Sequence, residues 1–205
     1  MKSRCSKNCM EMEKSNHFRY TWHLIKTDMA RYGHHTNLLG VLRIFSPYSF
    51  SFKMTFWYRI GHYLTICNHP ILRKVLLPLV RLIHQHNSYR TGIQMPFRVE
   101  IGEGLLFGHY SCIIINGHTK IGNHVTISQG VTLGNNFSKG QGAPVIGDNC
   151  VLGPGCKVLG PIDIGHHSFV GANAVITRSF TENSVLGGAN LLLGTNGEEV
   201  VKLYS

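Results

Sequence analysis

Histidines and cysteines are the residues of this chain that could do chemistry, and the chain holds 13 of the first and 6 of the second. A neutral imidazole can take a proton near pH 7, and a thiolate can attack a carbonyl or bind a metal ion. The sequence contains neither a Gly-x-Ser-x-Gly elbow nor a Cys/His catalytic signature. Cys5 and Cys9 with His17 form only a weak zinc pattern, so no metal site is expected. Which histidine acts on a substrate therefore depends on how the chain folds.

A six-residue repeat runs through the second half of the chain. From Met95 onward an aliphatic residue recurs at every sixth position, usually followed by glycine. An α-helix needs a period of 3.6 residues and a single strand a period of 2, so neither fits. The repeats are Ile101-Gly102, Phe107-Gly108, Ile113-Ile114, Ile121-Gly122, Ile127-Ser128, Leu133-Gly134, Ile146-Gly147, Leu152-Gly153, Val158-Leu159, Ile164-Gly165, Val170-Gly171 and Ile176-Thr177.

Each repeat is expected to form a short strand and a corner, with the aliphatic residue pointing inward. The fifth position of the repeat, mostly small or β-branched, should also point inward, and it includes Ser111, Cys150 and Cys156. Three repeats close one triangular coil, and stacked coils bury an aliphatic column, so the sequence predicts a parallel β-helix. Two insertions interrupt the period, between Ile113 and Ile121 and between Leu133 and Ile146. In such a solenoid, insertions become loops on one face, commonly the binding face.

The net charge of +10 belongs to the first part of the chain. Residues 1–90 hold 14 Lys and Arg against 3 acidic residues, whereas residues 91–205 hold 6 against 7. Apolar residues of the first part recur at helical spacing, so we expect a basic α-helical domain over 1–90, with 1–15 disordered. The β-helix domain then covers 91–187, with a loop at 135–144, and residues 188–205 form a C-terminal tail.

The basic stretch from Arg73 to Arg90 is also amphipathic. We consider two roles for it. It is either a solvated face that lies over an oligomer contact, or a surface that attracts anionic lipid or a phosphorylated carrier. No nucleic-acid motif occurs, so nucleic acid is not an expected partner. The apolar runs are too short to span a bilayer, and the start of the chain lacks the apolar core of a secretory signal. Scattered cysteines are typical of reduced thiols. We therefore expect a cytoplasmic protein whose basic helices could touch the inner membrane surface.

Two runs of the sequence resemble a known family. Gly104–His109 and Ile127–Gly134, together with the six-residue repeats, resemble the hexapeptide-repeat acyltransferases, and within them the serine acetyltransferase branch. Tyr58–Leu64 resembles the last helix before the β-helix in that branch. The resemblance covers about residues 56–190. It implies a mainly β protein, a left-handed parallel β-helix after a small α-helical N-terminal domain. It also implies a homotrimer, acetyl-CoA as the donor and active sites between neighbouring subunits.

The resemblance assigns roles to particular residues. His109 aligns with the catalytic histidine, which would take the proton of an acceptor hydroxyl as it attacks the thioester and then protonate the departing thiolate. Such direct transfer needs no acyl-enzyme, so Cys112 is not expected to act as a nucleophile. His118, His124, His166 and His167 are expected to face solvent at corners. The acetyl-CoA groove would use Gly134 and Asn135 near the thioester, Pro154 and Ala172 along the pantetheine arm, and Thr177 and Arg178 near the nucleotide phosphates.

Four positions depart from the serine acetyltransferase pattern. Gly108 stands where the family has an Asp before the catalytic histidine, and Gln94 stands where it has the Asp that orients this histidine. Gly142 and Ala143 stand where an Arg-His pair helps to hold serine. The partner of His109 would then be Glu100, Glu103 or a backbone carbonyl, and the sequence does not choose among them.

The missing charges favour a sugar over a zwitterionic amino acid, because a small amino acid offers little besides its charges. This variant pattern, together with the short helical part, resembles the acetyltransferases of capsule and exopolysaccharide clusters. The resemblance implies an acetyl-CoA-dependent O-acetyltransferase that acts on a sugar of a capsular or extracellular polysaccharide or its precursor. Acetylation of serine for cysteine biosynthesis is the alternative. A zinc-dependent carbonic anhydrase on the same architecture is disfavoured, because His109, His118 and His124 are spaced wrongly around the coil. The short helical part and the Leu203–Ser205 ending favour a trimer over a hexamer and argue against a sulfhydrylase partner.

Overall fold

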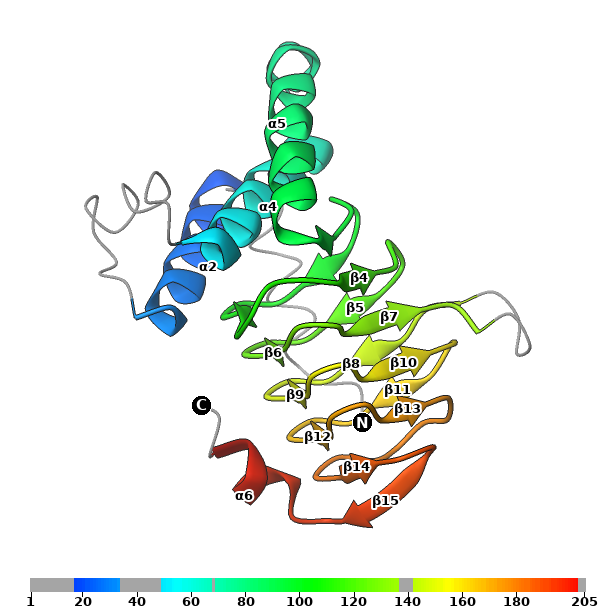
Figure 1. The fold of residues 1–205 in the computed structure, drawn as a ribbon. Helices are drawn as coiled ribbons and strands as arrows, with labels where there is room; N and C mark the ends of the chain where they lie inside the picture. Colours follow the sequence, from blue (N-terminus) through cyan, green and yellow to red (C-terminus); the bar gives the residue numbers. More distant parts are fainter. Residues whose placement is uncertain (1–16, 34–48, 68, 137–141, 203–205) are drawn as a thin grey trace.

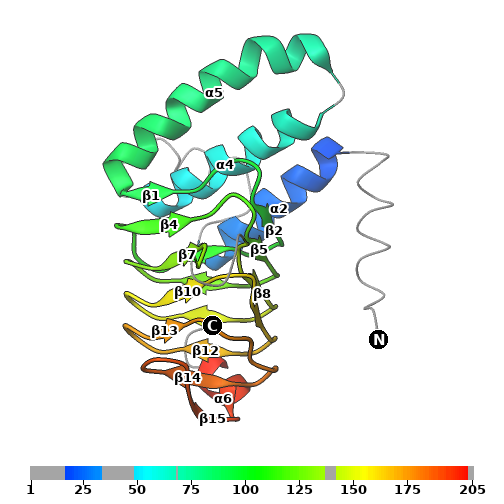
Figure 2. The same ribbon diagram turned by 90° about the vertical axis from the view of Figure 1, so that its right-hand side faces the viewer.

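The computed structural model describes residues 17–33, 49–67, 69–136 and 142–202. Helices α2 (His17–Arg31), α4 (Phe50–Ile66) and α5 (Pro70–Thr91) lie at one end of a stack of short parallel strands (Figures 1 and 2). The expected disorder of residues 1–15 lies outside the described residues. Within those ranges, no helix combines the length and the apolar character needed to cross a membrane.

The strands form the three faces of a left-handed β-helix, as the six-residue repeat predicts. Face A holds β1 (Ile93–Gln94), β4 (Ile113–Ile115), β7 (Thr132–Gly134), β10 (Lys157–Leu159) and β13 (Val175–Ile176). Face B holds β2 (Glu100–Ile101), β5 (Lys120–Ile121), β8 (Val145–Ile146) and β11 (Asp163–Ile164). Face C holds β3 (Leu106–Phe107), β6 (Thr126–Ile127), β9 (Val151–Leu152), β12 (Phe169–Val170), β14 (Val185–Gly187) and β15 (Leu191–Gly194).

The two ends of the stack are closed differently. At the far end β15 turns back antiparallel to β14, and the short helix α6 (Gly197–Lys202) packs near β12. At the near end, no strand of the described residues precedes β1, β2 and β3 of the first coil, and the helices lie there instead (Figure 2).

The aliphatic residues of the repeat line the inside of the prism, one column to a face, as predicted. All but the partly exposed Ile101 and Phe180 of face B are buried. Cys150 and Cys156 are buried among them, and burial raises the pKa of each thiol to about 12, so both are packing groups rather than nucleophiles. The columns are Ile115, Leu133, Val158 and Ile176 on face A, Ile101, Ile121, Ile146, Ile164 and Phe180 on face B, and Phe107, Ile127, Leu152, Val170 and Leu186 on face C.

The first of the two predicted insertions lies elsewhere than the repeat suggests. Ile115, not Ile113, pairs with Leu133, so the six-residue period from Ile115 to Ile121 is regular. Ile113 is also buried, in the small-residue column, whereas Ser111, predicted for that column, is exposed. The two additional residues therefore belong to the corner between Phe107 and Ile113. The prediction was wrong because three consecutive isoleucines fit the period in either phase.

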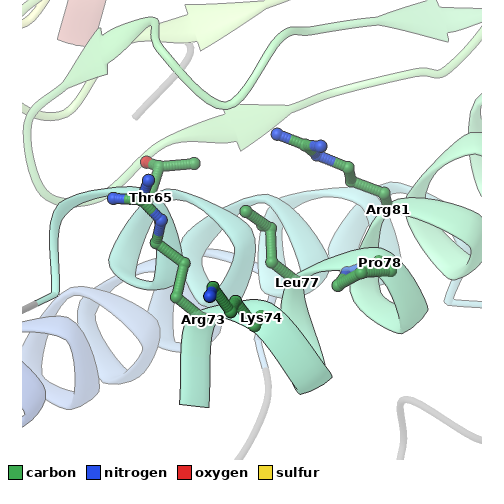
Figure 3. Close-up of a pocket in the computed structure, with 6 residues that line it drawn as sticks. All are labelled: Thr65, Arg73, Lys74, Leu77, Pro78 and Arg81. Atoms are coloured by element: carbon green, nitrogen blue, oxygen red, sulfur yellow. The ribbon is translucent and has the colours of Figure 1, made fainter. Parts of the chain in front are cut away.

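Two helices, α4 and α5, form a hairpin over the first coil. Pro70 occupies the first turn of α5, and Gly92 ends the helix in the left-handed conformation at φ 68°. The helix continues through Pro78, which lies on its exposed side. Between α4 and α5 lies a hollow of about 380 Å³ (Figure 3), which is lined by Thr65, Arg73, Lys74, Leu77, Pro78 and Arg81.

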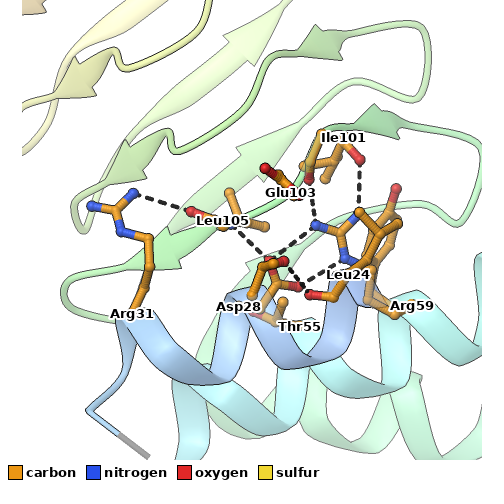
Figure 4. A network of polar contacts seen from close by, with 12 residues as sticks. Leu24, Asp28, Arg31, Thr55, Arg59, Ile101, Glu103 and Leu105 are labelled. Atoms are coloured by element: carbon orange, nitrogen blue, oxygen red, sulfur yellow. Dashed lines mark hydrogen bonds and ion pairs between the residues drawn. The ribbon is translucent and has the colours of Figure 1, made fainter. Parts of the chain in front are cut away.

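A buried ion pair joins the helices to the first coil (Figure 4). Arg59 of α4 donates from Nε to the Asp28 carboxylate of α2 at 2.8 Å, and both side chains are almost fully buried. Arg59 also donates to the carbonyls of Ile101 and Gly102, and Asp28 accepts the Leu105 N–H at 2.8 Å. A buried charge pair is stable only when its remaining hydrogen-bonding groups are satisfied, and here the backbone of the first coil satisfies them.

Candidate active site

His109 lies at the corner where the chain passes from face C to face A, between β3 and β4. The side chain is exposed, and within the described residues it makes no hydrogen bond to its own protomer. Two residues of this enlarged corner have a positive φ, 116° for Ser111 and 52° for Cys112. Gly108 to Cys112 are all exposed, so the imidazole of His109 is accessible to a substrate.

Gln129 occupies the corresponding corner of the next coil. Gly130 donates its N–H to the Ser111 carbonyl at 2.9 Å, which places Gln129 directly under the His109 corner. The Gln129 Oε1 is buried and has no hydrogen-bond partner within the described residues. The Lys157 ammonium donates to the Gly130 carbonyl at the same corner. The sequence interpretation did not single out Gln129, although it lies within the Ile127–Gly134 run that carries the resemblance.

The predicted donor-binding residues fall into two separate groups. Pro154 and Ala172 lie at the C-to-A corner, on the coils below His109 and Gln129. The other four predicted donor-binding residues lie at the A-to-B corner, on the other edge of face A. One protomer therefore does not bring all of them together with His109. The second group consists of Gly134, Asn135, Thr177 and Arg178.

Polar contacts fix the A-to-B corner. Asn135 accepts a hydrogen bond from the Asn116 side chain at 3.0 Å. Two coils below, the Asn190 side chain accepts the Thr177 N–H at 2.6 Å and donates to the Thr177 hydroxyl at 2.9 Å. Arg178 is exposed, donates to the Asn190 carbonyl at 2.9 Å and lies 5.0 Å from the Phe180 ring centroid. Its guanidinium keeps donors free for a phosphate, because it has five N–H groups.

The two carboxylates considered as partners of His109 are engaged elsewhere. Glu100, on face B, pairs with Lys120 at 3.0 Å. Glu103, at the B-to-C corner, pairs with His23 at 2.7 Å and with His124 at 3.5 Å. Neither lies at the corner that holds His109.

The histidines considered as a zinc set occupy three different corners. His109 follows face C, His118 follows face A and His124 follows face B. The described part of the protomer holds no group of three residues able to bind a metal ion. His118 and His124 are exposed, as is His166, which accepts the Asp148 N–H. His167 is only partly exposed.

The positions that depart from the serine acetyltransferase pattern differ in how much space surrounds them for a larger side chain. A Cβ atom built on Gly108 would meet no atom within 4 Å, so this position could accept a side chain. A Cβ atom on Gly142 would lie 2.6 Å from the Pro161 Cβ, so a larger residue there requires a shift. Gln94 is exposed on face A, beside Ile114 of the next coil.

The stacked coils and the corner histidine define a class of enzymes, the hexapeptide-repeat acyltransferases. Residues 143–178 match the family model described as "Bacterial transferase hexapeptide (six repeats)". A solved structure titled "Serine Acetyltransferase- Complex with CoA" superposes with a TM-score of 0.67 and 25% identity, covering 90% of this chain and 73% of that one.

Comparison with curated relatives identifies the family within this class. A serine acetyltransferase of Helicobacter pylori strain J99 is 37% identical over 133 residues, which make up 64% of this chain and 74% of the relative. A serine acetyltransferase of Staphylococcus xylosus is 36% identical over 138 residues, or 66% of this chain. Those residues span 64% of the Staphylococcus protein, slightly under two thirds of its length. The chain belongs to the serine acetyltransferase family.

These relatives correct the prediction of a polysaccharide acceptor. The curated relatives and the solved structures are serine acetyltransferases, which supports the alternative prediction of serine as the acceptor. The polysaccharide prediction was based on charged residues of the family pattern that are absent from a few positions of this chain. Those positions are only four residues, whereas the match to a serine acetyltransferase extends over 66% of the chain.

Proposed function

We propose that this protein transfers an acetyl group from acetyl-CoA to the hydroxyl of serine, yielding O-acetylserine and free CoA. The observation that supports it most is the match to serine acetyltransferases over two thirds of the chain, which includes the His109 corner. The exposed imidazole of His109 supplies the general base that this reaction needs, because a serine hydroxyl holds its proton far above neutral pH.

The reaction is direct transfer. The neutral imidazole of His109 takes the hydroxyl proton while the serine oxygen bonds to the thioester carbonyl carbon. The negative charge that develops on the carbonyl oxygen needs N–H donors, and backbone groups of the glycine-rich corners can supply them. The carbon–sulfur bond then breaks, and the imidazolium returns its proton to the CoA thiolate. All atoms and charges balance without an acyl-enzyme, so Cys112 has no role in the chemistry.

The donor lies in a groove that two subunits share. In a threefold ring with face A toward the axis, the C-to-A corner of one subunit lies beside the A-to-B corner of the next. This places His109, Pro154 and Ala172 of one copy opposite Gly134, Asn135, Thr177 and Arg178 of its neighbour. Outward apolar side chains on face A support this packing, since Ile114 is 45% exposed and Val175 is 38% exposed in the single chain.

Each of the two corners supplies residues that contact a different part of acetyl-CoA. Gly134 and Asn135 lie near the thioester, Pro154 and Ala172 line the pantetheine arm, and Thr177 with Arg178 faces the nucleotide phosphates. A planar guanidinium suits phosphate oxygens. We place the protein in the cytoplasm, which the free thiols of Cys67, Cys112, Cys150 and Cys156 support.

Product analysis tests the proposal. The purified full chain is incubated with acetyl-CoA and L-serine, and O-acetylserine is detected by mass spectrometry while CoA thiol release is followed. L-Alanine, which lacks the hydroxyl, is the matched control, and L-threonine and L-homoserine test the size of the acceptor site. We expect saturable thiol release with serine and none above background with alanine. Thiol release that serine does not increase, from a protein that binds CoA, would contradict serine as the acceptor.

A further inference from the structure

A cluster of basic and aromatic side chains lies beside the His109 corner. Tyr110, next to His109 in the chain, is exposed, and its ring centroid lies 5.5 Å from that of Phe50, the first residue of α4. The Arg90 guanidinium lies 5.0 Å from the centroid of the same Phe50 ring, and the Lys53 ammonium also lies 5.0 Å from it. We call Phe50, Lys53, Arg90 and Tyr110 the corner cluster.

The fold holds the helices of this cluster against the corner. Gly92, which ends α5, accepts the Ile113 N–H at 3.1 Å. A Cβ atom on Gly92 would lie 2.9 Å from the backbone nitrogen of Cys112 and 3.4 Å from the Cα of Ser111, so the end of α5 packs directly on the backbone that follows His109. Helix α4 contacts β3, the strand that leads into the corner. Both helices are therefore fixed to the first coil next to the corner (Figure 2).

The two cations of the corner cluster have no acidic partner. Arg90 is exposed and Lys53 is partly exposed, and neither makes an ion pair within the described residues. The described parts of α2, α4 and α5 contain one acidic residue, Asp28, which is buried against Arg59. Contact with the face of the Phe50 ring restrains the two cations but leaves their N–H groups free to donate. The corner cluster therefore attracts a small anion to the side of the His109 corner.

A serine acceptor needs a positive group of this kind. Serine is a zwitterion at neutral pH, so its site must receive a carboxylate close to the hydroxyl that reacts. Gly142 and Ala143 stand where the family pattern has the Arg-His pair that helps to hold serine, so this chain lacks the cation of that pair. The Lys157 ammonium, one coil further along, is already bound to the Gly130 carbonyl. The corner cluster provides the positive charge that the absent pair would supply.

We propose that Arg90, assisted by Lys53, binds the carboxylate of the acceptor, while Phe50 and Tyr110 form the wall that holds the guanidinium in place. The inference rests on the proposed function and names the residues that select an amino acid with a free carboxylate. A planar guanidinium can donate two parallel N–H···O bonds to a carboxylate, which fixes its orientation as well as its position. The hydroxyl of an acceptor held in this way is free to reach His109.

Kinetics with two acceptors test this role. L-Serinamide keeps the hydroxyl and the ammonium of L-serine but lacks the carboxylate. R90Q should lower kcat/KM for L-serine about tenfold or more, through a higher KM, because a charged hydrogen bond is lost. It should change kcat/KM for L-serinamide and KM for acetyl-CoA by less than about twofold. K53Q should have a smaller effect in the same direction, and R90K, which keeps the charge without the planar fork, should recover part of the loss.

Arg81 supplies the matched control. It is an exposed arginine of the same helix that lines the hollow between α4 and α5, and R81Q should match the parent with both acceptors. Thermal melting of each variant shows that it is folded. If R90Q loses activity equally with L-serine and L-serinamide, or keeps full activity with L-serine, this role of Arg90 is overturned while serine remains the acceptor. A parent without serine-dependent thiol release contradicts the proposed function itself, and this role with it.

Discussion

The Tyr32 hydroxyl accepts the backbone N–H of Phe107 at 2.8 Å, two residues before His109. Phe107 belongs to β3, the edge strand of face C, which pairs on one side with β6 and on the other with no strand of the described residues. Asp28, one turn earlier on α2, accepts the Leu105 N–H in the same way. Tyr32 and Asp28 therefore supply the acceptors that a neighbouring strand would supply, and they fix the segment that leads into the His109 corner.

Replacing this acceptor should affect both stability and catalysis. Tyr32→Phe leaves the buried Phe107 N–H without a partner, which costs about 1–3 kcal/mol of unfolding free energy. We expect kcat to fall severalfold while KM for acetyl-CoA stays within twofold, because the His109 corner loosens and the donor groove does not. Tyr89→Phe, which removes an exposed hydroxyl that accepts from Gln85, is the control and should change neither quantity. An unchanged kcat in folded Tyr32→Phe would show that α2 does not hold the corner.

The His84 imidazole should make the protein less stable in mild acid. Its Nε2 lies 2.9 Å from the Met95 carbonyl, and its Nδ1 is buried without a partner in the described residues. Burial lowers the pKa of His84, although the hydrogen bond to the Met95 carbonyl opposes this shift. The unfolded chain then takes up a proton near pH 6.5 that the folded chain resists, so the contribution of His84 to stability falls as pH drops through 6.5.

This effect is measured as a difference between two proteins. Unfolding free energies of the parent and of His84→Gln are compared at pH 7.5 and pH 5.5. The parent should lose more stability than the variant, by up to about 1.4 kcal/mol per pH unit below 6.5. Every other ionisable group is present in both proteins and cancels in the comparison. Equal losses would mean that His84 titrates normally.

Gly108 should accept the carboxylate that serine acetyltransferases place before the histidine. The open space around it allows Gly108→Asp without a clash. A carboxylate there can hold the serine ammonium, and a charged hydrogen bond of about 1.5–3 kcal/mol corresponds to a fall of roughly tenfold or more in KM for serine. Gly108→Asn has the same shape without the charge and should lower KM much less. Equal effects of the two variants would show that the zwitterion is not held at this position.

Arg178 should contribute to donor binding alone. Arg178→Ala is expected to raise KM for acetyl-CoA about five- to tenfold and to leave KM for serine unchanged, because it removes a phosphate contact. Acetyl-pantetheine lacks the nucleotide phosphates, so parent and variant should use it equally well. A donor KM that does not change with acetyl-CoA would remove Arg178 from the groove.

The sequence alone predicts the β-helix well, because its period is a property of neighbouring residues. Leu133, Ile146 and Leu152 occupy the inward positions that the repeat assigns to them. The phase at Ile113–Ile115 depends on pairing with strands of other coils, so the repeat could not place the two extra residues in the His109 corner.

The sequence does not predict contacts between segments that are distant along the chain. No spacing indicates that Tyr32 accepts a hydrogen bond from Phe107 of β3 or that Asp28 accepts one from Leu105 just before it, since each pair is separated by more than 70 positions along the chain. The site was predicted from two runs of residues, and that prediction assigned the general base to His109 and did not single out Gln129. The acceptor was predicted wrongly because missing side chains show which contacts are lost and not which ones replace them.

The central claim is that His109 takes the proton from serine as acetyl leaves CoA. It is tested most directly by serine-dependent thiol release from acetyl-CoA with the parent and with His109→Ala, using His86→Ala, an exposed histidine of α5, as the control. We expect His109→Ala to lower kcat by ~10²–10⁴-fold with an unchanged thermal melt, and His86→Ala to match the parent. Activity of His109→Ala within threefold of the parent would contradict the account.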